Sequence, residues 1–402
     1  MARIWDMDHV IRGKEGKLDV RSALARPDET AHAWRLEQVS LTHIHRLHAD
    51  VESLIGHVYR VDVTGPPSLD HTAIHAPGGI WIPAVPEDLV VGEVDAFARD
   101  RNIVSIPIPG YWIHKDEKLL LESPPSQGEK IFYLCHGGGY TAETAHPEGT
   151  ISRILKDFLK NSSSPSIRRT FAVEYRLSSS GESGKGTVFP FPAALLDALA
   201  GYVYLVKFGF LEENIILVGD SAGGNLALAL TRYLLSNKEQ QPELPKTPGS
   251  LVLLSPWTDL TEQFTPNPRS SLIINSERDW INSGALSTDA RVFLGGRPEH
   301  VELAFRNPYI SPASPILLGL TPDFSARTIS FSGFPKTFID NGSFESFNSQ
   351  IRHLRDGMME DLGEELVTYN EVDGAVHDYL IFGWHDPDRT VTSRKILKWL
   401  KE

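Results

Sequence analysis

The sequence predicts an α/β fold in which helices cover both faces of a mostly parallel β-sheet. From about residue 102 onward, short apolar runs alternate with longer segments of helical periodicity. Buried apolar strands separated by amphipathic helices are typical of such sheets. The chain contains neither a GxGxxG nor a Walker A pattern, so a nucleotide-binding fold does not explain the alternation.

The candidate elements follow one another in a regular order. The strands are short apolar runs at 103–108, 118–121, 131–135, 171–174, 215–218, 251–254, 337–340 and 366–369. The helices repeat apolar residues every three or four positions, at 148–159, 192–208, 222–235, 345–358 and 389–400. Earlier in the chain, an apolar stripe at 44–58 predicts a helix packed on the core, with a lid or a homodimer contact as the alternative. A segment rich in Pro and Gly follows at 65–86.

One stretch interrupts the alternation. Residues 259–335 show loops and short helical patterns but no strand–helix rhythm. In a compact domain, an interruption of this length is usually a lid or a subdomain. The sequence therefore divides into an N-terminal region (1–101), a core in two parts (102–258 and 336–402) and an insertion (259–335).

Composition narrows the functional classes. The chain has 402 residues, of which 41% are hydrophobic, and a formal net charge of −13. The acidic excess argues against a nucleic-acid surface and against docking on anionic lipid. No apolar run approaches the roughly 20 residues of a membrane span, and the N-terminus lacks the apolar run of a signal peptide. The chain has one cysteine, Cys135, which cannot form an intramolecular disulfide. Together, these observations predict a cytoplasmic protein with no transmembrane segment and no nucleic-acid partner.

Histidines are frequent in the N-terminal region. A metal cluster there is conceivable, but the chain has neither an HExxH motif nor paired cysteines. We therefore expect solvated side chains and neither a metal nor an organic cofactor. The residues concerned are His32, His43, His45, His48, His57, His71 and His75.

The sharpest local motif is GDSAG at 219–223, which follows a candidate strand and opens a helical run. A serine on a tight strand-to-helix turn needs glycine two positions to either side, because a Cβ atom there would collide with the reversing backbone. The turn also directs the positive end of the helix dipole toward the serine oxygen. Ser221 is therefore a candidate nucleophile with Asp220 as a supporting residue. A helix start merely capped by either side chain is the alternative.

A glycine-rich loop forms the second motif. His136 and Gly137 lead into Gly138 and Gly139 at the end of the candidate strand 131–135. Consecutive glycines allow the backbone to approach a bound carbonyl group and to present N–H groups to it. With the N–H of Ala222, those of Gly138 and Gly139 would form an oxyanion hole of three donors. We expect His136 to support the loop by hydrogen bonding. A flexible glycine turn is the alternative.

These motifs occur together in the order of a known family. The set HGGGY (136–140), EYRL (174–177), FPAALLDAL (191–199), GDSAGGNLALAL (219–230), LLSPWTDLT (253–261), YISP (309–312) and VHDY (376–379) resembles the hormone-sensitive-lipase-like branch of the α/β-hydrolases. The resemblance runs from about residue 102 to the C-terminus and implies an esterase or lipase. It also implies an eight-stranded, mostly parallel sheet, capped by the N-terminal region and by the insertion after the sixth strand.

The resemblance also indicates the other catalytic residues. In this fold the triad residues follow one another along the chain as serine, acid and histidine, so the histidine base should come after the last strand. His377 lies there, in the VHDY motif. The family pattern places the acid at Glu345, while Asp340 and Asp373 are alternatives. A neutral imidazole is needed to take the serine proton, so activity should fall as the pH drops through the histidine range near 6.5.

The reaction indicated is the hydrolysis of a small-molecule ester by a serine hydrolase with a Ser221–Glu345–His377 triad. An aryl formamide or amide hydrolase, a ligand-binding relative and a lyase are the alternatives on the same fold. The plant gibberellin receptor resembles this branch without the catalytic histidine, which the present chain retains. The polar loop 178–191 is longer than the family pattern, so the family's substrate preference does not carry over.

Overall fold

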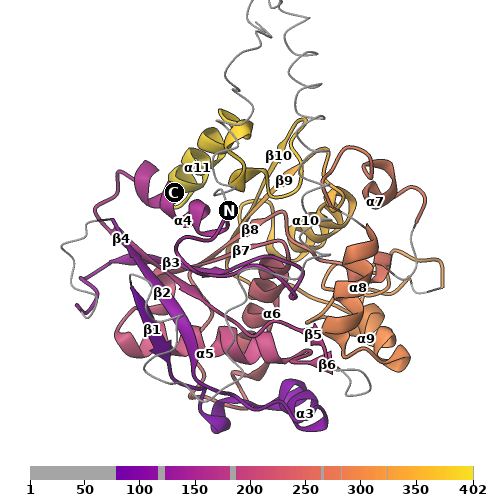
Figure 1. The fold of residues 1–402 in the computed structure, drawn as a ribbon, viewed down its shortest axis with the longest axis horizontal. Helices are drawn as coiled ribbons and strands as arrows, with labels where there is room; N and C mark the ends of the chain where they lie inside the picture. The colour runs from indigo at the N-terminus through magenta and orange to yellow at the C-terminus, as the bar shows by residue number, and fades with distance from the viewer. Residues whose placement is uncertain are drawn as a thin grey trace, which may run out of the picture.

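The computed structural model describes residues 78–115, 123–181, 187–263, 267–281, 283–323 and 325–401. They form an eight-stranded sheet in the order β1-β2-β4-β3-β7-β8-β9-β10 (Figure 1). β2 is antiparallel to both of its neighbours, whereas the strands from β4 to β10 are parallel. The mostly parallel sheet predicted from the sequence is therefore confirmed. The strands are β1 (Gly79–Ile82), β2 (Ile108–His114), β3 (Lys130–Cys135), β4 (Ile167–Val173), β7 (Ile215–Asp220), β8 (Ser250–Leu254), β9 (Lys336–Gly342) and β10 (Val367–Val372).

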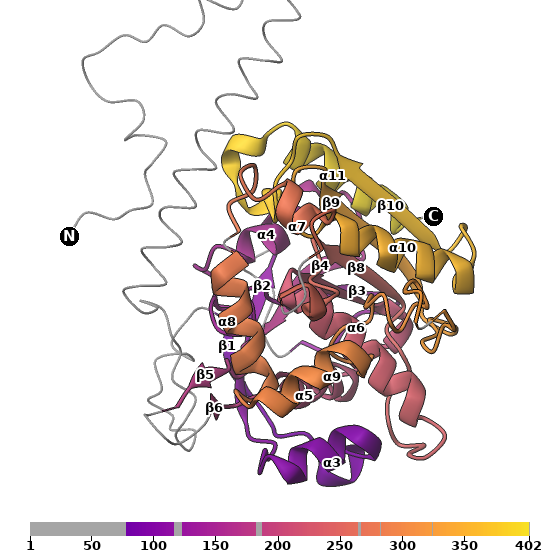
Figure 2. The ribbon, with the colours of Figure 1, turned by 90° about the vertical axis from the view of Figure 1, so that its right-hand side faces the viewer.

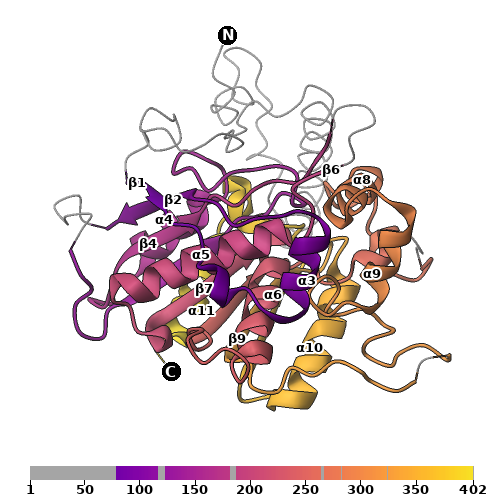
Figure 3. The same cartoon turned by 90° about the horizontal axis from the view of Figure 1, so that it is seen from below.

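Helices cover both faces of this sheet because the strands bury alternate side chains on each side. In β3, Tyr133 and Cys135 join one core cluster, whereas Phe132 and Leu134 join the other. α5, α6 and α10 complete the first cluster and lie on one face in Figure 3; α4 and α11 complete the second. The helices of the core are α3 (Gly92–Asp100), α4 (Ser152–Asn161), α5 (Ala193–Phe208), α6 (Ala222–Asn237), α10 (Asn348–Leu362) and α11 (Asp388–Trp399).

The first two strands differ from the sequence prediction. The expected strand 103–108 is wrong, because residues 103–107 form no strand and β2 begins only at Ile108. Pro107 has no N–H to donate to a sheet ladder, and Val104 is 64% exposed. β1 instead comes from the Pro- and Gly-rich segment 65–86, and α3 was not expected. The expected strand 118–121, the stripe 44–58 and the N-terminal histidines lie outside the described residues.

The insertion separates β8 from β9, the sixth and seventh strands of the large sheet in chain order. Its described residues form short helices, as expected from their sequence. They are η5 (Leu260–Gln263), α7 (Ser271–Ile274), α8 (Ser283–Leu294), η6 (Pro298–His300) and α9 (Val301–Arg306). In Figure 1 the helices α7, α8 and α9 lie at one side of the molecule, and α8 and α9 are next to each other there and in Figure 2.

The loop 178–191 holds a second, two-stranded sheet. β5 (Ser179–Ser180) pairs with β6 (Thr187–Val188). Next to it, a buried ion pair joins the EYRL motif (174–177) to the FPAALLDAL motif (191–199). The guanidinium of Arg176 lies 2.8 Å from the carboxylate of Asp197. The same carboxylate accepts the backbone N–H of Arg176 at 2.8 Å. These contacts hold the chain after β4 against α5.

Neither a membrane-crossing helix nor a metal cluster is present in the described ranges. None of their helices combines the length and the apolar character that a membrane crossing requires. In the same ranges, no three His, Cys, Asp or Glu side chains are grouped as a metal site would require.

Candidate active site

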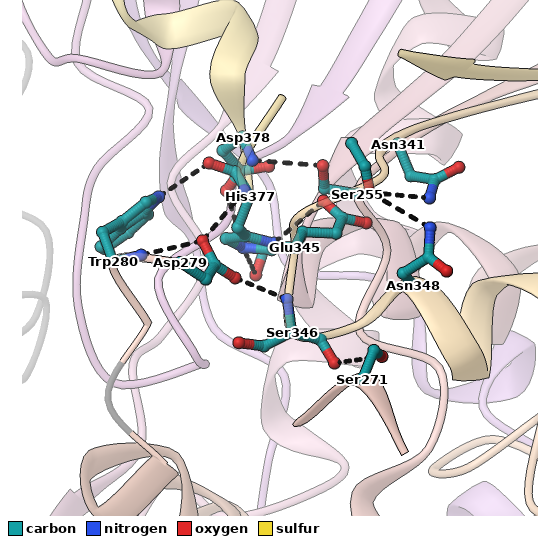
Figure 4. A network of polar contacts seen from close by, with 12 residues as sticks. Ser255, Ser271, Asp279, Trp280, Asn341, Glu345, Ser346, Asn348, His377 and Asp378 are labelled. Carbon is teal, nitrogen blue, oxygen red and sulfur yellow. Dashed lines mark hydrogen bonds and ion pairs between the residues drawn. The ribbon is translucent and has the colours of Figure 1, made fainter. Parts of the chain in front are cut away.

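The candidate residues gather where the parallel strands end. The glycine loop follows β3, Ser221 follows β7, and Ser255 follows β8. Glu345 and His377 lie in the loops after β9 and β10. Because parallel strands place their carboxyl ends at the same edge of a sheet, residues distant in sequence meet there. Figure 4 shows Glu345 and His377 beside Ser255 at this edge.

Ser221 occupies a strained turn between β7 and α6. Its backbone has φ 51° and ψ −119°, a conformation that costs a residue with a side chain about 1–3 kcal/mol. Its N–H donates to the carbonyl oxygen of Leu254 at 2.9 Å. A Cβ atom at Gly219 would overlap the carbonyl group of Gly223, and one at Gly223 would overlap that of Cys135. Both glycines of the motif are therefore required by close backbone approach.

The glycine loop lies directly against this turn. A Cβ atom at Gly137 would overlap the carboxylate of Asp220 and stand 3.1 Å from Cβ of Ser221. Gly138 and Gly139 have φ angles of 98° and 60°, which favour glycine. A larger residue at Gly137 would therefore push the loop away from the serine, whereas one at Gly138 or Gly139 would overlap Ala142 or Asp289.

The three backbone N–H groups expected to form the oxyanion hole are unpaired in the described residues. Those of Gly138, Gly139 and Ala222 donate no hydrogen bond within the described part of the chain. Ala222 is the first residue of α6, so its N–H is one of the unpaired donors at a helix start, where the dipole is positive. The arrangement can therefore receive a negatively charged oxygen.

His136 supports the loop from within the core. Its Nδ1 lies 2.8 Å from the carbonyl oxygen of Gly137, and its ring stacks on Tyr175 with centroids 4.2 Å apart. The Tyr175 hydroxyl donates to the carbonyl oxygen of His136 at 2.7 Å. Burial lowers the pKa of His136 to about 4. The ring is therefore neutral near pH 7 and Nδ1 can donate to Gly137.

His377 faces Ser221. Its Nε2 lies 3.0 Å from Ser221 Oγ, and the two residues are 2% and 6% exposed. The same nitrogen lies 3.0 Å from Oδ2 of Asp378. Asp378 has φ 50°, and its N–H donates to Ser255 Oγ at 3.1 Å. A neutral Nε2 can accept the serine proton, whereas a protonated ring can donate to either oxygen.

Glu345 lies on the other side of the same ring. Its Oε2 is 3.7 Å from Nδ1 of His377, a distance that suits an ion pair but exceeds a hydrogen bond. Of the two alternative acids, Asp340 accepts hydrogen bonds from the Tyr379 hydroxyl at 3.2 Å and from Asn370 at 2.5 Å. The other, Asp373, is exposed. Of these three carboxylates, Glu345 is the one that contacts the imidazole.

Burial and neighbouring charges alter the acidity of the whole site. Burial acts to lower the pKa of His377, but the carboxylates of Asp378 and Glu345 outweigh it and raise that pKa well above 6.5. Burial raises the pKa of Glu345 to about 7, against the opposing effect of His377. Burial and the charge of Asp378 also raise the pKa of Asp220 far above its ordinary value. The imidazole is therefore a stronger base than a solvent-exposed histidine.

The insertion contacts the glycine loop through α8. The Thr141 hydroxyl donates to Asp289 at 2.7 Å. The ring of Tyr140 stacks on Phe293, with centroids 3.9 Å apart, and its hydroxyl donates to Asn225 at 2.6 Å. Helices α6 and α8 thus hold the loop from two directions.

Two acidic residues of the site were not singled out from the sequence. Asp378 follows the base directly, and this adjacency was the one signal that could have indicated it. Asp279 belongs to the insertion and accepts the N–H of His377 at 3.1 Å. No motif surrounds Asp279, so only the tertiary structure brings it to the site.

Comparison with known proteins places this geometry in context. A family model described as alpha/beta hydrolase fold matches residues 131–381. Esterase LipU of Mycobacterium tuberculosis is 32% identical over 197 residues, which cover 48% of this chain and 58% of that protein. The chain spans about half the length of the curated relatives it matches.

Solved structures extend the similarity to most of the chain. A hormone-sensitive lipase from a metagenome library is 25% identical with a TM-score of 0.54, and the match covers 73% of this chain and 82% of that one. An esterase/lipase from an uncultured bacterium has a TM-score of 0.56 at 20% identity, over 91% of this chain and 97% of that one. The second match supports the fold alone.

Proposed function

The chain belongs to the alpha/beta hydrolase fold family, in the branch of hormone-sensitive lipase, and we propose that it is a serine carboxylic-ester hydrolase for small to medium esters. A single distance carries this proposal: Ser221 Oγ lies 3.0 Å from Nε2 of His377 in a buried site. The similarity to an esterase supports the same reaction class. Glu345 completes the proposed triad.

Acylation begins at Ser221. The neutral Nε2 of His377 takes the hydroxyl proton while Oγ forms a bond to the ester carbonyl carbon. The carbonyl electron pair moves to oxygen, and the N–H groups of Gly138, Gly139 and Ala222 stabilise that oxyanion. Each such donor typically contributes about 2.7–4 kcal/mol to the transition state. The C–O bond to the alcohol then breaks, and the alcohol oxygen takes the proton from Nε2.

Deacylation repeats these steps with water. Nε2 of His377 takes one proton from water as the water oxygen attacks the acyl carbon. The tetrahedral intermediate then releases Ser221 Oγ, which recovers its proton from Nε2, and the carboxylic acid departs. Glu345 stabilises the imidazolium that forms in both halves of the reaction. Protein, ester and water account for every proton and electron pair.

The raised basicity of His377 sets the pH dependence. Despite the opposing effect of burial, Asp378 and Glu345 hold the pKa of His377 well above 6.5. The base is neutral only above that pKa, so kcat/KM should fall as the pH drops through it. We therefore expect the acid limb of the profile above pH 6.5, whereas the sequence alone predicted it near that value.

The remaining assignments are also proposals. Residues 259–335 would act as a cap, supported by the contacts of α8 with the glycine loop. The N-terminal region 1–101 would act as a second cap on the family resemblance alone, except for β1 and α3, which belong to the core. A cytoplasmic location is supported by the acidic composition and the single cysteine, and a homodimer by the apolar stripe 44–58.

The test is hydrolysis of p-nitrophenyl esters of increasing chain length. Ser221→Ala should reduce turnover by about 10⁶-fold, as removal of a triad serine generally does. An active-site phosphonate should label Ser221 stoichiometrically and abolish hydrolysis in parallel. A Ser221→Ala variant that keeps about a tenth of wild-type activity would overturn the mechanism.

The same assay separates the rival functions. An N-formyl anilide, run beside the esters, would be hydrolysed faster than any ester by an amide hydrolase. Phosphonate labelling without turnover of any ester or amide would indicate a ligand-binding protein or a lyase.

A further inference from the structure

We propose that Asp279, together with Trp280, positions the loops that carry the base and the acid. This role rests on the proposed function, since it concerns the same hydrolytic site. Both residues belong to the insertion, between α7 and α8. Figure 4 shows them in contact with the segments of His377 and of Ser346, the residue that follows Glu345.

The two oxygens of Asp279 bind two different loops. Oδ1 accepts the backbone N–H of His377 at 3.1 Å, and Oδ2 accepts that of Ser346 at 2.6 Å. Asp279 is only 1% exposed, so solvent does not compete for these hydrogen bonds. One carboxylate therefore joins the backbone of the base to the backbone beside the acid.

Trp280 binds the backbone carbonyl group of His377. Its indole Nε1–H donates to the carbonyl oxygen of His377 at 2.7 Å, and its ring centroid lies 5.7 Å from that of the imidazole. Its own backbone N–H donates to Oδ1 of Asp279 at 2.9 Å. Both polar groups of the His377 backbone are thus fixed by adjacent residues of the insertion, which restricts the direction of its side chain.

The same segment of the insertion also holds the acid loop. Asn275 donates its side-chain N–H to the carbonyl oxygen of Glu345 at 3.0 Å. The Ser271 hydroxyl donates to the carbonyl oxygen of Ser346 at 2.7 Å. Ser346 is therefore bound at its N–H by Asp279 and at its carbonyl by Ser271.

These backbone contacts matter because the acid and the base are not hydrogen-bonded to each other. Glu345 Oε2 and His377 Nδ1 are 3.7 Å apart, which is too long for a hydrogen bond to fix their relative position. Asp279 supplies the missing link through the backbone. A misplacement of about 1 Å at a catalytic group can cost about 100-fold in rate.

The charge of Asp279 also reaches the imidazole. Burial raises the pKa of Asp279, while His377 opposes that rise. The other acidic groups around this ring are Asp378 on its own loop, Glu345 after β9 and Asp220 at the end of β7. Removing the charge of Asp279 should therefore lower the pKa of His377 and move the acid limb of the activity profile to lower pH.

The test compares two buried carboxylates of the insertion. Asp279→Asn keeps the size of the side chain but turns an amide N–H₂ toward one of the two backbone donors. We expect kcat on a p-nitrophenyl ester to fall about 100-fold with KM nearly unchanged, because ground-state binding is not altered. The matched control is Asp259→Asn: Asp259 is 1% exposed and accepts the N–H of Thr261 at 2.9 Å. It should lower the thermal midpoint but leave kcat near the wild-type value.

Each outcome decides the role of Asp279. A folded Asp279→Asn enzyme with wild-type kcat, or an equal loss of kcat in both variants, would overturn it. If Asp279→Asn does not fold, Trp280→Phe replaces it in the test, since this change removes the indole N–H and keeps an aromatic ring. A lower kcat at unchanged KM supports the positioning role, and an unchanged kcat overturns it.

Phosphonate labelling separates this inference from the proposed function. If wild-type hydrolysis does not depend on Ser221, the proposed function itself fails. If Ser221 is essential but Asp279→Asn reacts with the phosphonate at the wild-type rate and keeps its kcat, only the positioning role fails.

Discussion

Asp378 provides a direct test of the electrostatics of the site. Its Oδ2 lies 3.0 Å from Nε2 of His377, and the two side chains are 5% and 2% exposed. At this distance and burial, the carboxylate stabilises the protonated imidazole. Asp378→Asn removes the charge and keeps the shape of the side chain. The pKa of His377 should therefore fall.

The size of the effect follows from the hydrogen bond. A hydrogen bond to a charged group contributes about 1.5–3 kcal/mol, and about 1.4 kcal/mol corresponds to one pKa unit. Asp378→Asn should therefore lower the pKa of His377, because the protonated ring loses about 1.5–3 kcal/mol of stabilisation. Because the neutral ring is the base, the acid limb of kcat/KM moves to lower pH, by about one pH unit for each 1.4 kcal/mol of stabilisation lost. The plateau at high pH should fall, since a weaker base takes the serine proton less readily.

The measurement is a pH profile of kcat/KM on a p-nitrophenyl ester, with a proton NMR titration of the His377 ring beside it. Asp356→Asn is the control, because it removes the same charge from the surface of α10, where Asp356 pairs with Arg355. Asp356→Asn should leave the acid limb of kcat/KM at its wild-type pH. An acid limb that stays where it is in Asp378→Asn, or that moves to higher pH, would refute the reasoning.

Three further outcomes are expected. Glu345→Gln should lower kcat by about 10²–10⁴-fold, whereas Asp340→Asn should change it far less, because Glu345 contacts the imidazole and Asp340 does not; steady-state kinetics on one ester distinguish them. Gly223→Ala should abolish folding or activity, since its Cβ atom would overlap a backbone carbonyl, and circular dichroism with the esterase assay will show which. Asp197→Ala should lower the free energy of unfolding by about 3–5 kcal/mol in urea titrations, because it leaves the buried guanidinium of Arg176 unpaired; a loss below about 1 kcal/mol would contradict this.

The central elements of the fold could be predicted closely from the sequence. The expected strands 215–218 and 251–254 lie within β7 and β8, and the expected helix 222–235 begins at the first residue of α6. These strands are buried on both faces, so their sequences are apolar throughout. The GDSAG motif fixes the helix start through its steric requirements.

The edge of the sheet was harder to predict. β1 and β2 meet in a region that contains several prolines, and the runs of large apolar side chains in them are only three residues long, at 80–82 and 111–113. Their pairing depends on long-range contacts with β4 that local periodicity does not report. The apolar residues at 103–106 therefore resembled a strand although they form none.

In the candidate site, too, some residues could be predicted from local sequence and others could not. Ser221 and the glycine loop follow from local backbone requirements, which leave a pattern in the sequence. The position of Glu345 came from the family resemblance, because no periodicity distinguishes it from Asp340. Asp279 could not be found, since its role depends on how the insertion packs against two loops that are distant in sequence.

The bridge made by Asp279 limits how this chain can be re-engineered. A chimera that replaced 259–335 with a segment of different length would change the side chains that α8 places against the glycine loop. It would also remove the acceptor of the backbone N–H groups of Ser346 and His377. Selectivity and turnover are then no longer separate design variables. A successful replacement segment would have to place an aspartate where Asp279 lies, so that its carboxylate still accepts the N–H groups of Ser346 and His377.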